Sequence, residues 1–188
     1  MRETLEALAE GDISVAEAEA ALAGYATTDA GRFDAARETR RGVPEGIYAA
    51  GKTPAEVATL AAAAVETAGR ALVTRADADD AAAVRAEFGD EVSFEHDERS
   101  GVVVVHGPDF AAPDIDATVT VVTGGTADAV PAGEAAAVAG EMGATVERID
   151  DVGVANLTRI TDQIDALRAA DVLIVAAGRE GALPTVVA

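Results

Sequence analysis

The sequence predicts an α/β protein whose C-terminal part is an open parallel sheet in three layers. Residues 118–123 and 171–177 are dominated by Val, Ile, Leu, Ala and Thr, which is the composition of strands covered on both faces. Each run ends in a loop that contains glycine and then opens a helical pattern, and further helical patterns separate the two. Strands connected in this way lie parallel in right-handed βαβ units, as in flavodoxin-like and Rossmann-like folds.

A smaller region of helices and strands precedes this sheet. Residues 1–30 predict a helical appendage and a linker, in which Ser14 and Glu17 form a capping box before the second helix and Gly24 to Gly31 form the linker. Residues 31–112 predict an α/β region. In chain order we expect a helix at 54–68 that starts at Thr53 and Pro54, a strand at 71–75, a helix at 77–88, and strands at 91–96 and 101–106 that form a hairpin.

Residues 113–188 predict the parallel-sheet domain, after a stretch from Gly107 to Asp116 that holds two of the six prolines. The expected order is strand 118–123, helix 129–142, strand 145–149, helix 155–169, strand 171–177 and a helix that begins at Gly181. That last helix carries apolar residues and reaches Ala188 within two turns. The apolar surface of this helix would need another part of the protein to cover it. We therefore expect the domain to be truncated at its C-terminus and the chain to be the front part of a longer protein.

Composition excludes several classes of protein. With 188 residues, 49% of them hydrophobic, the chain can bury one good core, but its apolar runs fall well short of the ~20 residues that span a bilayer. Its acidic, amphipathic start is not a secretory signal, so we expect a cytoplasmic protein. The absence of cysteine excludes disulfides and a thiol nucleophile from this chain, and His96 and His106 fit strand-end or surface positions better than a metal site.

The charge indicates a protein adapted to salt rather than one that binds nucleic acid. The chain carries 34 acidic and 14 basic residues, a formal net charge of −20, and Lys52 is its single lysine. We interpret this surface as that of a halophile's protein, in which salt screens the repulsion between carboxylates. An ordinary acidic protein would explain the charge but not the single lysine.

The loop after the first strand of the parallel sheet offers a phosphate site. Backbone N–H groups at Gly124 and Gly125 and the Thr126 hydroxyl can cradle a phosphate, because the loop opens a helix. Asp128 can cap that helix, bind a ribose hydroxyl or hold a cation on the phosphate. An ordinary strand-to-helix turn explains the same residues equally well, and the loop matches neither Gly-x-Gly-x-x-Gly nor a Walker A pattern.

Two further strand-end loops fall at the same edge of the sheet. Asp150 and Asp151 place a carboxylate pair after the second strand, and the loop from Gly178 to Gly181 offers Arg179 for an anion and Glu180 as an acid, a base or a hydroxyl ligand. Solvated acids and a glycine turn are the simpler interpretations of each loop alone. Three loops that converge on one edge favour a ligand site.

A basic and aromatic cluster lies in the N-terminal region. Arg40, Arg41, Tyr48 and Lys52 follow one another within a glycine-rich stretch, a combination that suits a carboxylate or a phosphate. Surface solvation explains the arginines well and the single lysine poorly.

Four ordered segments, at 41–53, 123–128, 147–155 and 170–184, resemble pyridinium-3,5-biscarboxylic acid mononucleotide synthase, the enzyme that starts nickel-pincer nucleotide cofactor synthesis. The C-terminal half is similar to the aminoimidazole ribonucleotide carboxylase and mutase of purine synthesis, a three-layer α/β fold that forms octamers. The resemblance implies carboxylation of the pyridinium ring of nicotinic acid adenine dinucleotide by carbon dioxide or bicarbonate, with hydrolysis of the phosphoanhydride and release of AMP. In that family a cysteine thiolate adds to the ring, and this chain has no cysteine.

The resemblance also implies roles for particular residues. Asp128 and Glu180 are the expected catalytic groups, and the substrate-binding residues are Arg41, Tyr48, Lys52, Gly124, Gly125, Thr126, Asp151, Gly178 and Gly181. We expect no tightly bound cofactor, and the resemblance leaves open whether Mg²⁺ binds with the substrate. The expected partners are a nucleotide substrate and further copies of the chain. The alternatives are the aminoimidazole ribonucleotide mutase, which lacks the Arg-Gly-x-Pro-Glu segment at 41–45, and a non-catalytic nucleotide-binding module.

Overall fold

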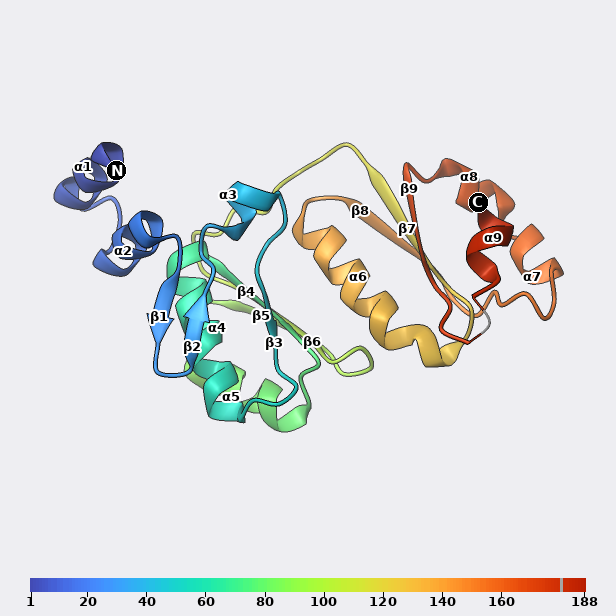
Figure 1. The fold of residues 1–188 in the computed structure, drawn as a ribbon, viewed down its shortest axis with the longest axis horizontal. Helices are drawn as coiled ribbons and strands as arrows, with labels where there is room; N and C mark the ends of the chain where they lie inside the picture. The colour runs from blue at the N-terminus through green and yellow to red at the C-terminus, as the bar shows by residue number, and fades with distance from the viewer. Residues whose placement is uncertain (180) are drawn as a thin grey trace. The chain divides into compact units, whose positions relative to one another are not determined.

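A computed structural model describes residues 1–179 and 181–188 (Figure 1). The chain divides into two compact units, Met1–Ala111 and Ala112–Ala188. Each unit combines helices with a sheet, so the α/β class that the sequence predicts is confirmed.

The first unit begins with two short helices, α1 (Arg2–Glu10) and α2 (Val15–Ala23). The predicted capping box starts α2. The Glu17 backbone N–H donates to the Ser14 hydroxyl at 3.1 Å, and the Ser14 N–H donates to the Glu17 carboxylate at 2.6 Å. Gly24, in the left-handed region at φ 80°, ends the helix.

The segment 24–31 is not the linker that the sequence predicts. Strands β1 (Ala26–Thr28) and β2 (Gly31–Phe33) pair there as an antiparallel hairpin. The Thr28 hydroxyl closes the turn, because it donates to the Gly31 carbonyl and accepts from the Ala30 N–H. Threonines that look like loop residues in the sequence therefore supply extended backbone and a turn contact.

A four-stranded mixed sheet forms the core of the first unit. Its strand order is β3-β4-β6-β5, with β3 parallel to β4 and the other pairs antiparallel. The strands are β3 (Gly46–Tyr48), β4 (Arg70–Thr74), β5 (Ser93–Asp97) and β6 (Val102–His106), and the helices are α3 (Arg37–Arg41), α4 (Pro54–Ala68) and α5 (Ala78–Glu87). Helices α4 and α5 bury Val57, Leu60 and Val84 with the strand residues Val73, Val103 and Val105.

The second unit contains the predicted parallel sheet, in three layers. Strand β7 (Thr118–Thr123) lies between β8 (Thr145–Ile149) and β9 (Val172–Ala176), and both pairs are parallel. Helix α6 (Ala129–Glu141) follows the 3₁₀ turn η1 (Thr126–Asp128) and packs on one face over Val119 and Val121. Figure 1 shows α7 (Thr158–Thr161), α8 (Ile164–Ala169) and α9 (Leu183–Val187) beyond the other face, where Val122, Ile160, Leu167 and Leu183 are buried.

The predicted single helix at 155–169 is wrong, because the structure has two short helices, α7 and α8. Side chains bond to nearby backbone at α7: the Asn156 side-chain oxygen accepts from the Thr158 N–H, and the Thr161 hydroxyl donates to the Thr158 carbonyl. The run of i to i−4 bonds ends at Gln163, whose N–H donates to the Ile160 carbonyl three residues back. Within the described residues, no helix is long and apolar enough to cross a membrane.

Candidate functional site

The loops that follow β7, β8 and β9 surround one open pocket in the second unit. Its volume is about 580 Å³. The parallel strands end at the same edge of the sheet, which is where this architecture places its ligands. The lining residues come from all three loops and are Gly124, Gly125, Thr126, Ala127, Asp128, Asp151, Gly153, Val154, Ala155, Ala177, Gly178 and Arg179.

Asp128 joins two of these loops. One of its carboxylate oxygens, Oδ2, accepts from the Gly125 N–H at 2.9 Å, within the loop after β7. The other, Oδ1, accepts from the Gly178 N–H, also at 2.9 Å, in the loop after β9. Each oxygen of the carboxylate is therefore bonded to a backbone amide of a different loop, and both amides belong to residues that the sequence predicts in the site.

Glycines let the three loops approach one another closely. A Cβ on Gly178 would lie 3.3 Å from Asp128 Oδ1, and one on Gly124 would lie 3.3 Å from the Ala177 side chain. A Cβ on Gly153 would lie only 2.5 Å from the Gly124 carbonyl oxygen, closer than packed atoms tolerate. The pocket wall thus requires a residue without a side chain at position 153.

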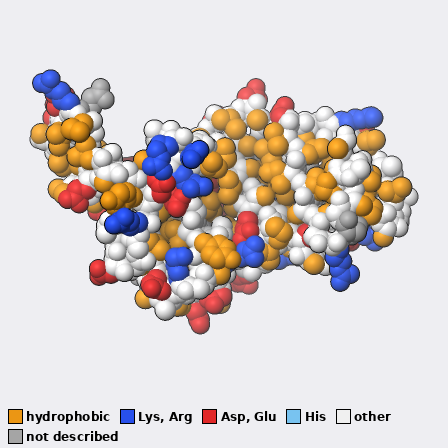
Figure 2. Space-filling model, in the orientation of Figure 1, with side chains coloured by type: hydrophobic (Ala, Val, Ile, Leu, Met, Phe, Trp, Pro, Cys, Tyr) orange, Lys and Arg blue, Asp and Glu red, His pale blue; other side chains and the backbone are white. Residues whose placement is uncertain are grey.

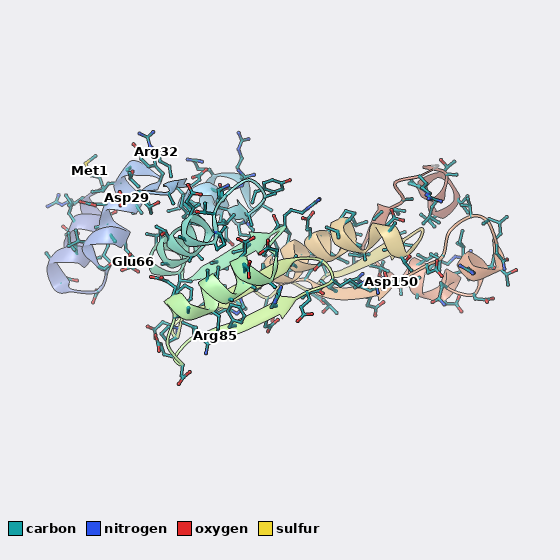
Figure 3. The ribbon with its side chains drawn as sticks, turned by 90° about the horizontal axis from the view of Figure 1, so that it is seen from below. Met1, Asp29, Arg32, Glu66, Arg85 and Asp150 are labelled. Carbon is teal, nitrogen blue, oxygen red and sulfur yellow. The ribbon has the colours of Figure 1, made fainter. Side chains whose placement is uncertain are left out.

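The carboxylate pair after β8 is engaged by neighbouring side chains. Asp151 has a left-handed backbone at φ 60°, and its carboxylate accepts from Arg159 Nη1 at 3.1 Å. Asp150, labelled in Figure 3 where β8 ends, accepts from Arg148 and from the Thr123 hydroxyl. The Thr123 hydroxyl oxygen in turn accepts from the Asp151 N–H at 2.9 Å. Of the two carboxylates, Asp151 lines the pocket.

The structure brings together most but not all of the predicted residues. Gly124, Gly125, Thr126, Asp128, Asp151 and Gly178 line the pocket, whereas Gly181 is absent from the described part of its lining. Glu180 lies outside the described residues. The remaining three, Arg41, Tyr48 and Lys52, belong to the first unit. There the Lys52 ammonium donates to the Tyr48 carbonyl oxygen at 2.6 Å, so it stabilises its own loop.

Ion pairs surround Arg41 on helix α3. Arg37 pairs with Glu45 at 3.2 Å, and Arg40 pairs with Asp34, whereas Arg41 is exposed at the last residue of the helix. Figure 2 shows basic and acidic side chains side by side over α3.

Burial raises the pKa of the Glu45 carboxyl above its ordinary value, and the Arg37 guanidinium partly opposes that rise.

The carboxylates that line the pocket are engaged by other groups of the protein. Nowhere in ranges 1–179 and 181–188 do three or more His, Asp or Glu side chains gather as a set of metal ligands. In the pocket the Asp128 oxygens are bonded to amides and the Asp151 carboxylate to Arg159. We therefore derive no step that uses Mg²⁺.

Sequence reasoning missed three residues that shape the pocket. These are Gly153, which permits the close approach of two loops, Arg159, which holds Asp151, and Thr123, which bridges β7 to the loop after β8. The position of Gly153 just after a strand was the available signal for a close backbone contact. Nothing in the sequence distinguishes Arg159 from the other arginines.

Two comparisons relate the chain to known proteins. A family model described as the LarB/PurE-like N-terminal domain matches residues 25–107. An uncharacterized protein of Methanocaldococcus jannaschii, MJ0165, is 30% identical over 201 aligned residues, which cover 100% of this chain and 76% of that relative. On these matches, the chain belongs to the family of proteins with a LarB/PurE-like N-terminal domain.

Proposed function

We propose that this chain binds nicotinic acid adenine dinucleotide and serves the carboxylation of its pyridinium ring, with hydrolysis of the phosphoanhydride and release of AMP. One observation carries the proposal: three strand-end loops converge on one pocket of about 580 Å³ in a chain of the LarB/PurE-like family. That family supports a carboxylase-type activity, and the resemblance of the four sequence segments supports this particular substrate.

The loop after β7 is the proposed site of the mononucleotide phosphate. Thr126 and Ala127 stand at the start of η1, which leads directly into α6, so their backbone N–H groups have no acceptor within the helix. A phosphate is stabilised at such a position by these N–H donors and by the helix dipole. The Thr126 hydroxyl adds a further donor at the pocket wall.

The chemistry sets a limit on what the residues of this chain can do. A pyridinium carbon is electrophilic, so a nucleophile must first add to the ring before a ring carbon can attack carbon dioxide. The chain has no cysteine to supply a thiolate. For this chain we therefore propose substrate binding, with Asp151 at the pocket wall. The proposed acid or base stays Glu180, which lies outside the described residues.

Titration calorimetry in molar potassium chloride tests the proposal. Nicotinic acid adenine dinucleotide and nicotinic acid mononucleotide should both bind, and AMP should bind far more weakly. Thr126→Val should weaken both ligands about tenfold, the loss of one phosphate hydrogen bond. Thr59→Val is the matched control, because Thr59 is exposed on α4 of the first unit. Absence of nicotinate nucleotide binding by the wild-type chain would refute the proposal.

The same titration separates the alternative functions. Tight binding of aminoimidazole ribonucleotide in place of nicotinate nucleotides would favour the mutase. The segment 41–45 weighs against that outcome, since the mutase lacks it. Equal binding of several unrelated nucleotides would favour a non-catalytic module.

A further inference from the structure

The Asp128 carboxylate makes one local and one long-range contact. Its bond to the Gly125 N–H spans three residues and is an ordinary cap of the turn before α6. Its bond to the Gly178 N–H spans 50 residues and connects the loops that follow β7 and β9. Helix capping needs only the first bond, so the second indicates a different role.

The surroundings of the carboxylate favour this second contact. Hydrogen bonds from amides to an ionised carboxylate are stronger than bonds between neutral groups. Gly124 and Gly178 both present their Cα hydrogens to Asp128, since a Cβ on either would lie 3.3 to 3.4 Å from one of its oxygens. No ion pair of Asp128 occurs within the described part of the chain.

We propose that Asp128 is a positioning residue that clips the loop after β9 to the loop after β7 and so fixes the width of the nucleotide pocket. Because both of its oxygens are bonded to backbone amides, the carboxylate acts through the loops and not on the pyridinium ring. This inference rests on the proposed function only for the identity of the ligand. The clip itself is a property of the ligand-free chain.

Hydrogen exchange of the ligand-free chain tests the clip directly. Asp128→Asn keeps the size of the side chain and one acceptor oxygen, which can still cap at Gly125. We expect the amide of Gly178 to exchange at least tenfold faster in Asp128→Asn and faster again in Asp128→Ala. Asp162→Asn is the control, because Asp162 is exposed and does not line the pocket.

The alternative of a simple helix cap gives a different result. In that case Asp128→Asn would leave the exchange of Gly178 unchanged, and only the Gly125 amide would lose protection in Asp128→Ala. This outcome overturns the clip.

Calorimetry with nicotinic acid mononucleotide then tests whether the Asp128 clip affects ligand binding. Asp128→Asn should weaken binding about tenfold, and Asp128→Glu, which keeps the charge on a longer side chain, should restore part of the loss. Full wild-type affinity in Asp128→Asn would overturn the inference that the clip sets the pocket. If the wild-type chain binds no nicotinate nucleotide, the proposed function fails, while the exchange result still decides whether the clip exists.

Discussion

Two threonines of the central strand β7 differ in whether their hydroxyls have partners. Thr120 and Thr123 are both fully buried, with 0% and 1% of their surface exposed. The Thr123 hydroxyl is bonded to Asp150 and to the Asp151 N–H, whereas the Thr120 hydroxyl has no partner among the described residues. A buried hydroxyl without a partner costs stability, and one that joins two segments adds it.

We expect Thr120→Val to stabilise the protein by about 0.5–1.5 kcal/mol, because it removes an unsatisfied hydroxyl and keeps the shape of the side chain. Thr123→Val is the matched variant and should destabilise by roughly 1–2 kcal/mol, since it leaves the Asp151 N–H without its acceptor. Urea unfolding in molar potassium chloride measures both. Equal effects of the two variants would contradict this assignment.

Lys52 is held at the end of strand β3 by a hydrogen bond within its own loop. Its ammonium donates to the Tyr48 carbonyl oxygen, so one of its three N–H donors is engaged within the loop and two remain. The loop follows β3 and ends at Thr53, the first capping residue of α4. The side chain is therefore fixed at the end of a strand, which suits a binding role as well as a structural one.

We predict that Lys52→Ala weakens the binding of nicotinic acid adenine dinucleotide ten- to a hundredfold. A charge-assisted contact contributes roughly 1.5–3 kcal/mol, which corresponds to that change in affinity. Lys52→Arg should restore only part of it, because the planar guanidinium donates in a different geometry. Calorimetry compares these variants with Arg2→Ala, the removal of an exposed cation on α1. Equal affinity in all of them would leave Lys52 with the loop contact alone.

Single residues were predictable where their chemistry is local. The capping box of Ser14 and Glu17 was predicted from residues three positions apart and is present, and the predicted helix starts at Thr53 and Asp77 also carry capping boxes. The long-range partners of Asp128 and Asp151 were not predictable, because Gly178 is distant in the sequence and Arg159 resembles every other surface arginine. Of the residues predicted for the site, those of the second unit gather in part around the pocket, whereas Arg41, Tyr48 and Lys52 lie in the first unit.

At the scale of elements, the start of α4 illustrates how a cap and a charge act together. The Thr53 N–H and hydroxyl both donate to the Glu56 carboxylate, at 2.7 and 2.9 Å. The bond from the Thr53 backbone, followed by that from its hydroxyl, lowers the pKa of the Glu56 carboxyl below its ordinary value of 4.5. A carboxyl whose pKa is lower in the folded than in the unfolded chain stabilises the fold when it is ionised.

The pH dependence of a Glu56→Gln variant follows from this shift. The contribution of Glu56 is fully present above pH 4.5 and is lost as the pH falls through the lower pKa of the folded state. Wild type should therefore exceed Glu56→Gln in stability at pH 7, and the difference should shrink below pH 4.5. Urea unfolding of both proteins from pH 7 to pH 3 measures it. A difference that stays constant over this range would contradict the role of the ionised carboxylate.

The three loops at the end of the parallel sheet depend on the close approach of their backbones. We expect Gly153→Ala to destabilise the second unit by about 1–3 kcal/mol, because a Cβ 2.5 Å from the Gly124 carbonyl forces the loops apart. Nucleotide binding should weaken with it. Gly140→Ala is the control, since a Cβ there meets only Val146 at 3.9 Å and alanine favours the helix. Wild-type stability in Gly153→Ala would show that the loops adjust freely.

Elements were predicted well where periodicity and caps agreed. Helix α4 spans the predicted residues 54–68, and β8 spans the predicted residues 145–149. The hairpin of β1 and β2 was missed because each strand has only three residues, too few for an alternating pattern. The break between α7 and α8 was missed because residues 155–169 fit one helical pattern, whereas the Gln163 N–H donates to the Ile160 carbonyl three residues back.

For the whole molecule, the net charge of −20 is a property that the fold has to accommodate. Both compact units have small apolar cores rich in alanine and valine, and the carboxylates lie largely at their surfaces. Repulsion among exposed carboxylates acts over the Debye length, which is about 3 Å at 1 M ionic strength and about 10 Å at 0.1 M. The stability of a fold with this charge should therefore depend more on salt concentration than on any single hydrogen bond or ion pair.

We predict that lowering potassium chloride from molar concentration to about 0.1 M loosens or unfolds the chain, as the longer Debye length exposes each carboxylate to more of its neighbours. Circular dichroism and urea unfolding across this range measure the effect, which should be a progressive fall in the unfolding midpoint. Sucrose at matched osmolality is the control, because it favours compact states without screening charge. A midpoint that is indifferent to salt, or one that sucrose restores fully, would contradict adaptation to brine and leave the charge as that of an ordinary acidic protein.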